Sequence, residues 1–162
     1  MRACVQRVSE ASVTLRQTGE ITGHIGRGLL ILLGVGVSDS EDQARLLARK
    51  VAHLRIFDDE NGQMNLEAAD VGGAALVVSQ FTLFADCRRG KRPGFTEAAG
   101  CEKAEQLYRF FLREIERNGL TAAEGRFRTD MAVQLVNDGP VTIWLDTDFL
   151  EKNGSNQNAP ER

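Results

Sequence analysis

The sequence predicts an α/β fold: mixed α and β structure in a single domain, with mostly antiparallel strands in a barrel-like β/β/α arrangement and two main helices on one side. Three observations predict it. Strand-like runs, some alternating and some continuously apolar, occupy both the beginning and the end of the chain. Between them, two segments place apolar residues at helical spacing. A length of 162 residues, with 42% hydrophobic and 27% charged residues, is ordinary for one soluble globular domain.

The first part of the chain is expected to contain four strands, at residues 3–7, 11–15, 20–25 and 28–37. The last of these is almost continuously apolar, which is typical of a strand buried on both faces. Ser40 and Gln43 have the spacing of a capping box and predict the start of a helix. The apolar stripe of this helix continues to Leu54. The polar residues 57–65 are expected to form a loop.

A further strand is expected to start at residues 72–73 and to carry the polar residues Ser79 to Thr82 at its end. The second helix is expected at residues 101–118, where apolar residues line one side. Gly119 then suits the left-handed position that follows a helix. Both helices are expected to cover one side of the sheet.

The tetrad Asn137-Asp138-Gly139-Pro140 separates two apolar runs, 131–136 and 141–145. An Asn-Asp-Gly cluster in this position predicts a hairpin turn between two closing strands. The last stretch, residues 151–162, is rich in Asn, Ser, Gly and Pro and lacks apolar periodicity, which predicts a disordered C-terminal tail. We therefore expect a domain of residues 1–147 followed by a tail of residues 148–162.

The composition argues against several classes of protein. No apolar run approaches the roughly 18 residues that a membrane helix needs, and the first residues do not have the pattern of a signal peptide. Three widely spaced cysteines, without a Cys-x-x-Cys pair, argue against a disulfide framework and against a zinc site. We therefore expect a cytoplasmic protein without membrane contact, metal or cofactor.

The charge distribution leaves two interpretations of one segment open. The net charge of −3 disfavours broad binding to nucleic-acid phosphates. Residues 88–92, however, carry four positive charges in five residues. They form either a solvated loop or a local contact with phosphate.

Several kinds of hydrolytic site lack their characteristic residues. A Ser-His-Asp or Cys-His arrangement needs a histidine as base, and the chain has only His24 and His53. Neither has metal-ligand spacing to other His, Cys or acidic residues, so a structural or surface role is expected for both. No His-Glu-x-x-His, P-loop or Gly-x-Ser-x-Gly motif occurs, which argues against a metalloprotease, a nucleotide hydrolase and an α/β-hydrolase.

Two polar motifs remain as candidates for a site. Ser79, Gln80 and Thr82 form either an ordinary polar strand end or a group of donors that holds a developing oxyanion. Thr82 is also a candidate nucleophile, although no base to activate it is visible in the sequence. Gly139-Pro140 is either a plain turn or a backbone stripped of bulk, where carbonyl oxygens approach a ligand closely.

In these motifs and in others, the chain closely resembles the D-aminoacyl-tRNA deacylase family over residues 1–147. The stretches that carry the resemblance are residues 1–13, 54–57, 62–66, 77–83, 125–127 and 137–142. The Ser-Gln-x-Thr motif and the Gly-Pro-Val-Thr motif are highly specific in this context. The tail lies outside the resemblance.

The resemblance implies a homodimeric enzyme that proofreads by chirality. Its partner would be tRNA. The enzyme would hydrolyse the ester between a D-amino acid, or glycine, and the 3′ end of the tRNA, and it would leave L-aminoacyl-tRNA intact. Residues 139 and 140 would be joined by a cis bond and would enter the active site of the other subunit, where their carbonyl oxygens exclude an L side chain. The resemblance implies catalytic roles for Ser79, Gln80, Phe81 (through its N–H) and Thr82, and substrate-binding roles for Gly139, Pro140, Asn137, Arg7 and Met131.

Two mechanisms are compatible with the resemblance: attack by the Thr82 hydroxyl, and attack by water assisted by the terminal ribose 2′-OH. We favour the second, because the sequence shows no base for Thr82. Two other functions stay open, a non-catalytic RNA-binding module of the same fold and a general small-ester hydrolase that uses Thr82. The chain departs from the family pattern at Cys87, Gly94 and Arg128-Thr129, which bears on the details of tRNA contact.

Overall fold

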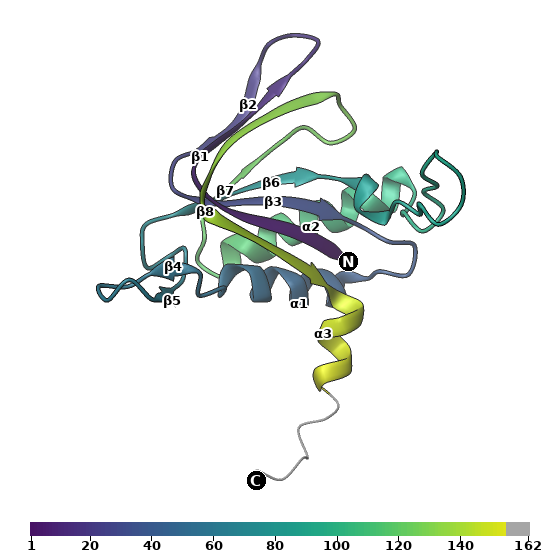
Figure 1. Ribbon diagram of the computed structural model, residues 1–162. Helices are drawn as coiled ribbons and strands as arrows, with labels where there is room; N and C mark the ends of the chain where they lie inside the picture. The colour runs from purple at the N-terminus through teal and green to yellow at the C-terminus, as the bar shows by residue number, and fades with distance from the viewer. Residues whose placement is uncertain (155–162) are drawn as a thin grey trace.

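The computed structural model describes the backbone of residues 1–154 and the side chains of residues 1–150. A curved sheet has its helices on one side (Figure 1). The strands are β1 (Arg2–Leu15), β2 (Ile21–Ile25), β3 (Gly28–Gly34), β4 (Phe57–Asp58), β5 (Met64–Leu66), β6 (Ala74–Ser79), β7 (Ala122–Glu124) and β8 (Met131–Asp146). The helices are α1 (Glu41–Ala52), α2 (Cys101–Arg117) and α3 (Thr147–Gly154), with a short 3-10 helix, η1 (Phe81–Phe84).

Strand β1 organises the main sheet. It pairs antiparallel with β3 through residues 2–8 and with β2 through residues 11–14, while β8 runs antiparallel along its other side. Strands β6 and β7 continue the sheet beyond β3 in parallel orientation, in the order β2-β1-β3-β6-β7. Most strand pairs are therefore antiparallel, as the sequence predicts.

The main sheet curls until its two ends approach each other. At Gly23 of β2, a Cβ atom would lie 2.6 Å from the carbonyl oxygen of Glu124 in β7, so only glycine permits this approach. The curled face encloses a small core made of Val8, Ala11, Val13, Ile25, Leu30, Leu76 and Val78. The predicted barrel-like arrangement is confirmed.

A larger core lies between the sheet and helices α1 and α2. Leu29, Ile31 and Leu33 of β3 point into this core, whereas Leu30 points into the small one. Because both faces of β3 are buried, its sequence is continuously apolar. The prediction of two main helices on one side of the sheet is also confirmed (Figure 1).

The start of α1 and the end of α2 agree with the local sequence signals, whereas α1 ends at Ala52, before the expected Leu54. The Ser40 N–H donates to Gln43 Oε1 (2.9 Å) and the Ser40 hydroxyl oxygen accepts from the Asp42 N–H (3.3 Å), which completes the capping box of α1. Helix α2 ends at Arg117 with Asn118 as its C-cap residue, and Gly119 follows with φ +84°. Local sequence decides these ends, which explains why they were predictable.

Two expected elements differ from the structure. Residues 3–7 and 11–15 belong to one strand, β1, whose pairing with β8 is irregular near Val8. The expected loop 57–65 contains the hairpin β4–β5. The carboxylate of Asp59 accepts from the N–H groups of Asn61 and Gln63 (2.9 and 3.1 Å) and thereby stabilises the turn.

The tetrad 137–140 is not a hairpin turn, and this prediction is wrong. Both flanking runs pair with β1 in the same direction, from the Leu15–Met131 pair to the Arg2–Asp146 pair, so β8 is one strand. Between the Val8–Asn137 and Gln6–Thr142 pairs, residues 138–141 stand opposite Arg7 alone. The tetrad therefore opens a wide bulge in a continuous strand.

The end of the described chain also differs from expectation. Helix α3 spans Thr147–Gly154, so the first part of the expected tail, from residue 148, is helical. The N–H of Thr147 donates to the Met1 carbonyl (2.9 Å), which ties this helix to the start of β1. The rest of the expected tail, residues 155–162, lies outside the described residues. Among the helices described, none has the length and apolarity needed to cross a membrane.

Candidate active site

The end of β6 brings the first polar motif to the edge of the sheet. Ser79 pairs with Leu33 of β3, and the Gln80 N–H still donates to the Leu33 carbonyl (2.8 Å). The strand was expected to continue through Thr82, but β6 ends at Ser79 and the chain turns into η1. A Cβ at Gly34 would lie 3.1 Å from the Gln80 carbonyl oxygen, so a glycine at the end of β3 makes room for this turn.

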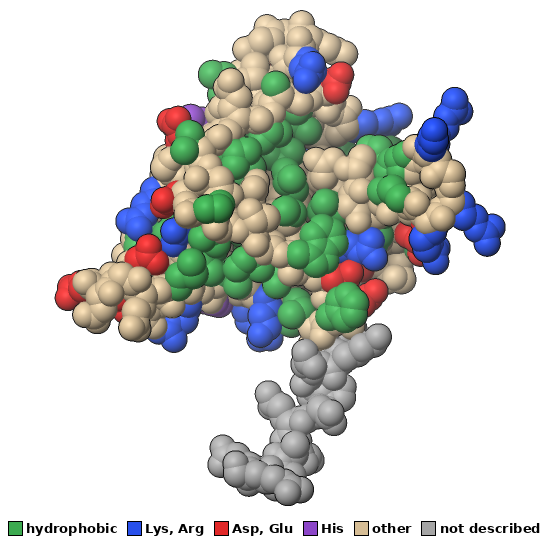
Figure 2. Space-filling model, viewed as in Figure 1, with side chains coloured by type: hydrophobic (Ala, Val, Ile, Leu, Met, Phe, Trp, Pro, Cys, Tyr) green, Lys and Arg blue, Asp and Glu red, His purple; other side chains and the backbone are tan. Residues whose placement is uncertain are grey.

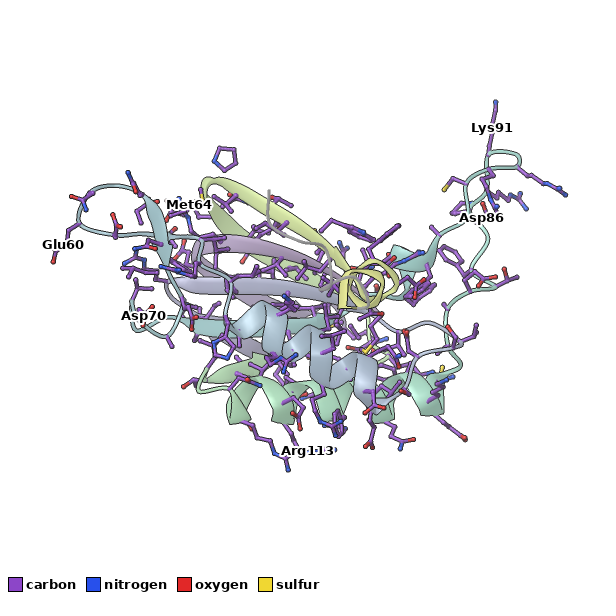
Figure 3. All side chains as sticks on the ribbon, turned by 90° about the horizontal axis from the view of Figure 1, so that it is seen from below. Glu60, Met64, Asp70, Asp86, Lys91 and Arg113 are labelled. Atoms are coloured by element: carbon purple, nitrogen blue, oxygen red, sulfur yellow. The ribbon has the colours of Figure 1, made fainter. Side chains whose placement is uncertain are left out.

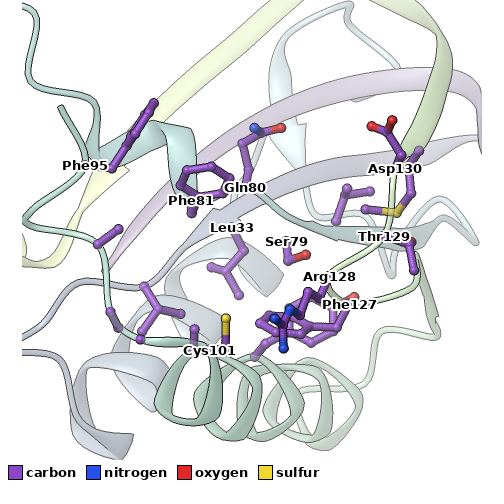
Figure 4. A pocket seen from close by; sticks show the side chains of 18 of the residues that line it. Leu33, Ser79, Gln80, Phe81, Phe95, Cys101, Phe127, Arg128, Thr129 and Asp130 are labelled. Atoms are coloured by element: carbon purple, nitrogen blue, oxygen red, sulfur yellow. The ribbon is translucent and has the colours of Figure 1, made fainter. Parts of the chain in front are cut away.

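A cavity of about 670 Å³ opens at this edge (Figure 4). Its walls come from the ends of β3 and β6, the start of η1, the start of α2 and the segment that leads into β8. Ser79, Gln80, Phe81 and Met131 line it. A mostly apolar hollow with a few convergent polar groups is the usual form of a small-molecule site.

The polar groups at the turn into η1 are hydrogen-bond donors. The cavity lining also includes the carboxylate of Asp130, on the segment that leads into β8, and does not include Thr82. The N–H groups of Phe81 and Thr82 open η1, and the first N–H groups of a helix have no acceptor inside it. The Gln80 side-chain amide donates to the Thr82 Oγ1. No His, Asp or Glu among the described residues is hydrogen-bonded to the Thr82 hydroxyl, which leaves it without an activating base.

Aromatic side chains form part of the wall. Phe81 and Phe95 meet edge to face, with ring centroids 4.9 Å apart, and Phe81 is 57% exposed. Deeper in, the Tyr108 hydroxyl donates to the Val77 carbonyl (2.9 Å), and burial raises the pKa of this phenol. The Tyr108 ring in turn lies 5.8 Å from that of Phe127. The wall is therefore braced against both β6 and the loop that follows β7.

Several cavity residues were not predicted as site residues. Cys101, Phe127 and Arg128 line the space, from segments that the sequence motifs did not mark as functional. Arg128 has φ +59°, an uncommon conformation for a residue with a Cβ. In Figure 4, Phe127 and Arg128 lie across the cavity from Phe95. Only the fold brings these segments together, although residues 125–127 were already among the family-like stretches.

The second motif forms the bulge of β8. Gly139 has φ +149°, and a Cβ there would lie 2.7 Å from both the N and the Cγ2 atoms of Val141. The position therefore requires glycine. The Gly139–Pro140 bond is cis, and both residues are exposed. Their backbone is presented to the outside of this chain.

Arg7 and Asn137 hold the bulge in shape. Arg7 is 6% exposed, and it donates to the carbonyls of Asp138 (2.8 Å) and Ile56 (2.6 Å). The Asn137 side chain accepts from the Val141 N–H (2.8 Å) and donates to the Val141 carbonyl (3.2 Å). These contacts give both residues a structural role; their expected contact with substrate stays a prediction.

The predicted site residues thus fall into two groups within one chain. Ser79 is level with Leu33 of β3 and so with Ala3 of β1, whereas Arg7 lies four residues further along β1. With about 3.3 Å per residue along a strand and 4.8 Å between neighbouring strands, the backbones of Ser79 and Arg7 are roughly 16 Å apart. The bulge lies beyond Arg7, on β8. The cavity and the Gly139-Pro140 bulge are therefore not adjacent.

Strand β8 has an edge that is unpaired within the described chain, and it exposes several apolar side chains. In the described residues β8 pairs only with β1, so its other edge is unpaired. Val136 and Trp144 are each 50% exposed and Leu135 is 36% exposed. Hydrophobic side chains gather along this face of the molecule in Figure 2. A long apolar edge of this kind favours association with another chain.

The described residues contain no group of three or more His, Cys, Asp or Glu side chains that could hold a metal ion. The hydrogen-bond donors at the cavity are the Ser79 hydroxyl, the Gln80 amide and the N–H groups at the start of η1. Such groups stabilise negative charge on oxygen, which is what an ester hydrolysis requires.

Comparison with known proteins links this geometry to one family. The family described as D-Tyr-tRNA(Tyr) deacylase matches residues 4–146. A D-aminoacyl-tRNA deacylase of Koribacter versatilis is 58% identical over 91% of this chain and 97% of its own length. One of Roseiflexus sp. is 60% identical over 91% of this chain and 94% of its own length.

Two solved structures share the fold. A c-Myc DNA Unwinding Element Binding Protein superposes with a TM-score of 0.82 at 40% identity, over 90% of this chain and 98% of its own. A probable eukaryotic D-amino acid tRNA deacylase superposes with a TM-score of 0.77, over 89% of this chain and 97% of its own. At 14% identity, the second likeness concerns the fold alone.

Proposed function

The chain belongs to the D-Tyr-tRNA(Tyr) deacylase family, and from that membership we propose how its geometry serves the reaction. It is a hydrolase that cleaves the ester bond of D-aminoacyl-tRNA and releases the tRNA and the D-amino acid, which is a proofreading reaction. The site residues, the dimer and the source of chiral selection are the subject of the proposal.

The cavity receives the aminoacylated end of the tRNA. The Phe81 N–H, at the start of η1, donates to the ester carbonyl oxygen, whose negative charge grows when the tetrahedral intermediate forms. Ser79 and Gln80 lie on the same wall and orient the substrate. Met131 supplies apolar contact from the start of β8.

The Gly139-Pro140 bulge acts on the cavity of a second copy of the chain. The observation that carries this proposal is the separation of the two groups: the bulge is exposed and lies away from the cavity of its own chain. The unpaired apolar edge of β8 supports the same conclusion, because a twofold dimer would cover it. Each active site then contains one cavity and the partner's bulge.

This arrangement accounts for chiral selection. Carbonyl oxygens of the rigid bulge face the α-carbon and leave space for a hydrogen there. A D-amino acid presents that hydrogen, and so does glycine, whereas an L-amino acid presents its side chain and clashes. Discrimination between D- and L-aminoacyl-tRNA thus comes from a steric clash that weakens binding of the L substrate. Arg7 and Asn137 contribute by fixing the bulge.

Water, assisted by the 2′-OH of the terminal ribose, is the proposed nucleophile. The Thr82 oxygen accepts a hydrogen bond from the Gln80 amide, and no carboxylate or imidazole of the described residues is hydrogen-bonded to it. A hydroxyl that arrives with the RNA removes the need for a titratable protein side chain in the cavity.

The experiment that tests the proposal is a paired assay with D-Tyr-tRNA and L-Tyr-tRNA, with and without a chelator. We expect D-Tyr-tRNA to be hydrolysed at a kcat/KM at least about 100-fold above that for L-Tyr-tRNA, a difference of about 2.7 kcal/mol that one steric clash supplies. The chelator is expected to change neither rate.

Equal cleavage of both enantiomers would contradict the steric account. Tight binding of uncharged tRNA without any turnover would favour a non-catalytic RNA-binding module. Rapid cleavage of simple D-amino acid esters, abolished by Thr82→Ala, would favour a general small-ester hydrolase.

A further inference from the structure

A strongly positive loop projects beside the cavity. Residues 86–94, here called the basic loop, carry four cations and one carboxylate, a net charge of +3, in a chain of net charge −3. The other residues therefore sum to −6. Asp86 and Lys91 lie on a segment that extends from the body, on the side opposite Glu60 (Figure 3). The positive charge is thus concentrated on one protrusion.

The basic loop is closed at its base and braced from within. The N–H groups of Asp86 and Gly94 donate to each other's carbonyls (2.7 and 2.9 Å). Arg88 donates to both carboxylate oxygens of Asp86, each at 2.8 Å. These hydrogen bonds lower the pKa of Asp86 to about 2, so the carboxylate stays charged and stays paired with Arg88. The one carboxylate of the loop is therefore paired with Arg88 and does not neutralise the other three cations.

Arg89, Lys91 and Arg92 have no such partner. All three are exposed, and none of them forms a hydrogen bond or ion pair with the described residues. Exposed cations without counter-ions are the usual electrostatic footprint of a phosphate-binding surface, where guanidinium and ammonium groups match phosphate oxygens.

The basic loop is attached to the rim of the cavity. Gly94 is followed at once by Phe95, which lines the cavity and packs against Phe81. Gly90, near the tip, is the fourth residue after Asp86, so the tip lies at most about 14 Å from the base of the loop. Along one strand of a duplex this length corresponds to about four phosphates, at roughly 3.4 Å each.

We propose that the basic loop binds the phosphates of the tRNA acceptor end, a few nucleotides before the aminoacylated one. The inference rests on the proposed function, since it needs the aminoacylated end in the cavity. Arg89, Lys91 and Arg92 contact phosphates, while the Arg88–Asp86 pair keeps the loop in shape. The loop therefore adds affinity for the long substrate without touching the ester.

The test compares two variants of equal charge on substrates of different length. The loop variant is Arg89→Gln/Lys91→Gln/Arg92→Gln. The control variant, Arg49→Gln/Lys50→Gln/Arg113→Gln, removes three exposed cations from α1 and α2; Arg113 lies on the helical side, away from the loop (Figure 3). The substrates are D-Tyr-tRNA and 3′-O-D-tyrosyl-adenosine, and uncharged acceptor-stem minihelix serves for direct binding.

We expect the loop variant to lose on the order of tenfold or more in kcat/KM on D-Tyr-tRNA at low salt, and in minihelix affinity. On D-tyrosyl-adenosine it should match the wild type, and the control variant should match it on both substrates. The slope of log(kcat/KM) against log[salt] on tRNA should become less negative by about 2 units, because about three phosphate contacts are lost.

Three outcomes would overturn the proposal: unchanged kinetics of the loop variant on tRNA, equal losses on both substrates, or equal losses in the loop and control variants. A smaller oligomer for the loop variant in size-exclusion chromatography would also overturn it and would assign the loop to contact between copies. Failure of the wild type on both substrates would instead refute the proposed function, and minihelix binding would still decide the role of the loop.

Discussion

Gly139 is a residue whose identity is dictated by its backbone. Its φ of +149° and the 2.7 Å approach of Val141 exclude any side chain. In the proposed shared site, the same lack of bulk would let the bulge come close to a substrate α-carbon. Arg7 and Asn137, which the resemblance marks as substrate-binding, are already engaged in holding this bulge. The proposed steric selection at one atom would thus depend on the rigidity of the residues around it.

The role of Thr82 gives a test at the same scale. If water assisted by the ribose 2′-OH is the nucleophile, Thr82→Ala should lower kcat by no more than about tenfold, or about 1.4 kcal/mol, through loss of the contact with Gln80. A D-Tyr-tRNA that ends in 2′-deoxyadenosine should instead react at least about 100-fold more slowly. Single-turnover kinetics measure both effects.

The reverse pattern would assign the attack to Thr82. In that case Thr82→Ala would abolish the reaction, and the deoxy substrate would still be hydrolysed at close to the normal rate.

Among the elements, those determined by neighbouring residues were predictable from the sequence, and those determined by distant strand pairing were not. The sequence shows three such features directly. They are the capping box of α1, the glycine after α2 and the continuously apolar run of β3. The bulge at 137–140 does not follow from local sequence, because a turn cluster between two apolar runs is also what a hairpin requires. Pairing with β1, more than 120 residues away, decides between the two.

The end of α1 provides a pH-dependent test. The imidazole Nδ1 of His53 lies 2.8 Å from Glu67 Oε2, and this hydrogen bond raises the pKa of His53 above its ordinary 6.5. A raised folded pKa means that the pair stabilises the fold fully below pH 6.5 and that the contribution is lost as the pH rises through the folded value.

We expect Glu67→Gln to return the His53 pKa toward 6.5 in an NMR titration. Since the pair is half-exposed, the variant should cost less than about 1 kcal/mol of unfolding free energy near pH 5 and nothing measurable near pH 9. A His53 pKa that is the same in both proteins would show that Glu67 does not cause the shift.

The whole molecule combines parts that are distant in sequence. The cavity takes its walls from segments around residues 33, 80, 100 and 130, and only the curled sheet brings these together. The sequence motifs pointed to two surfaces, one at Ser79 and one at Gly139. They could not show that the two surfaces are apart in one chain, because this separation is a property of strand register.

Sharing of active sites between two protomers is the central claim, and a mixed dimer tests it most directly. One protomer carries Gly139→Ala and the other Ser79→Ala/Gln80→Ala, and different affinity tags allow the mixed dimer to be isolated. Each variant alone should fold, form a homodimer and show little hydrolysis of D-Tyr-tRNA. The mixed dimer should recover about half of the wild-type rate, because one of its two sites combines an intact cavity with an intact bulge. A mixed dimer as inactive as its parents, or full activity of the Gly139→Ala homodimer, would contradict the account.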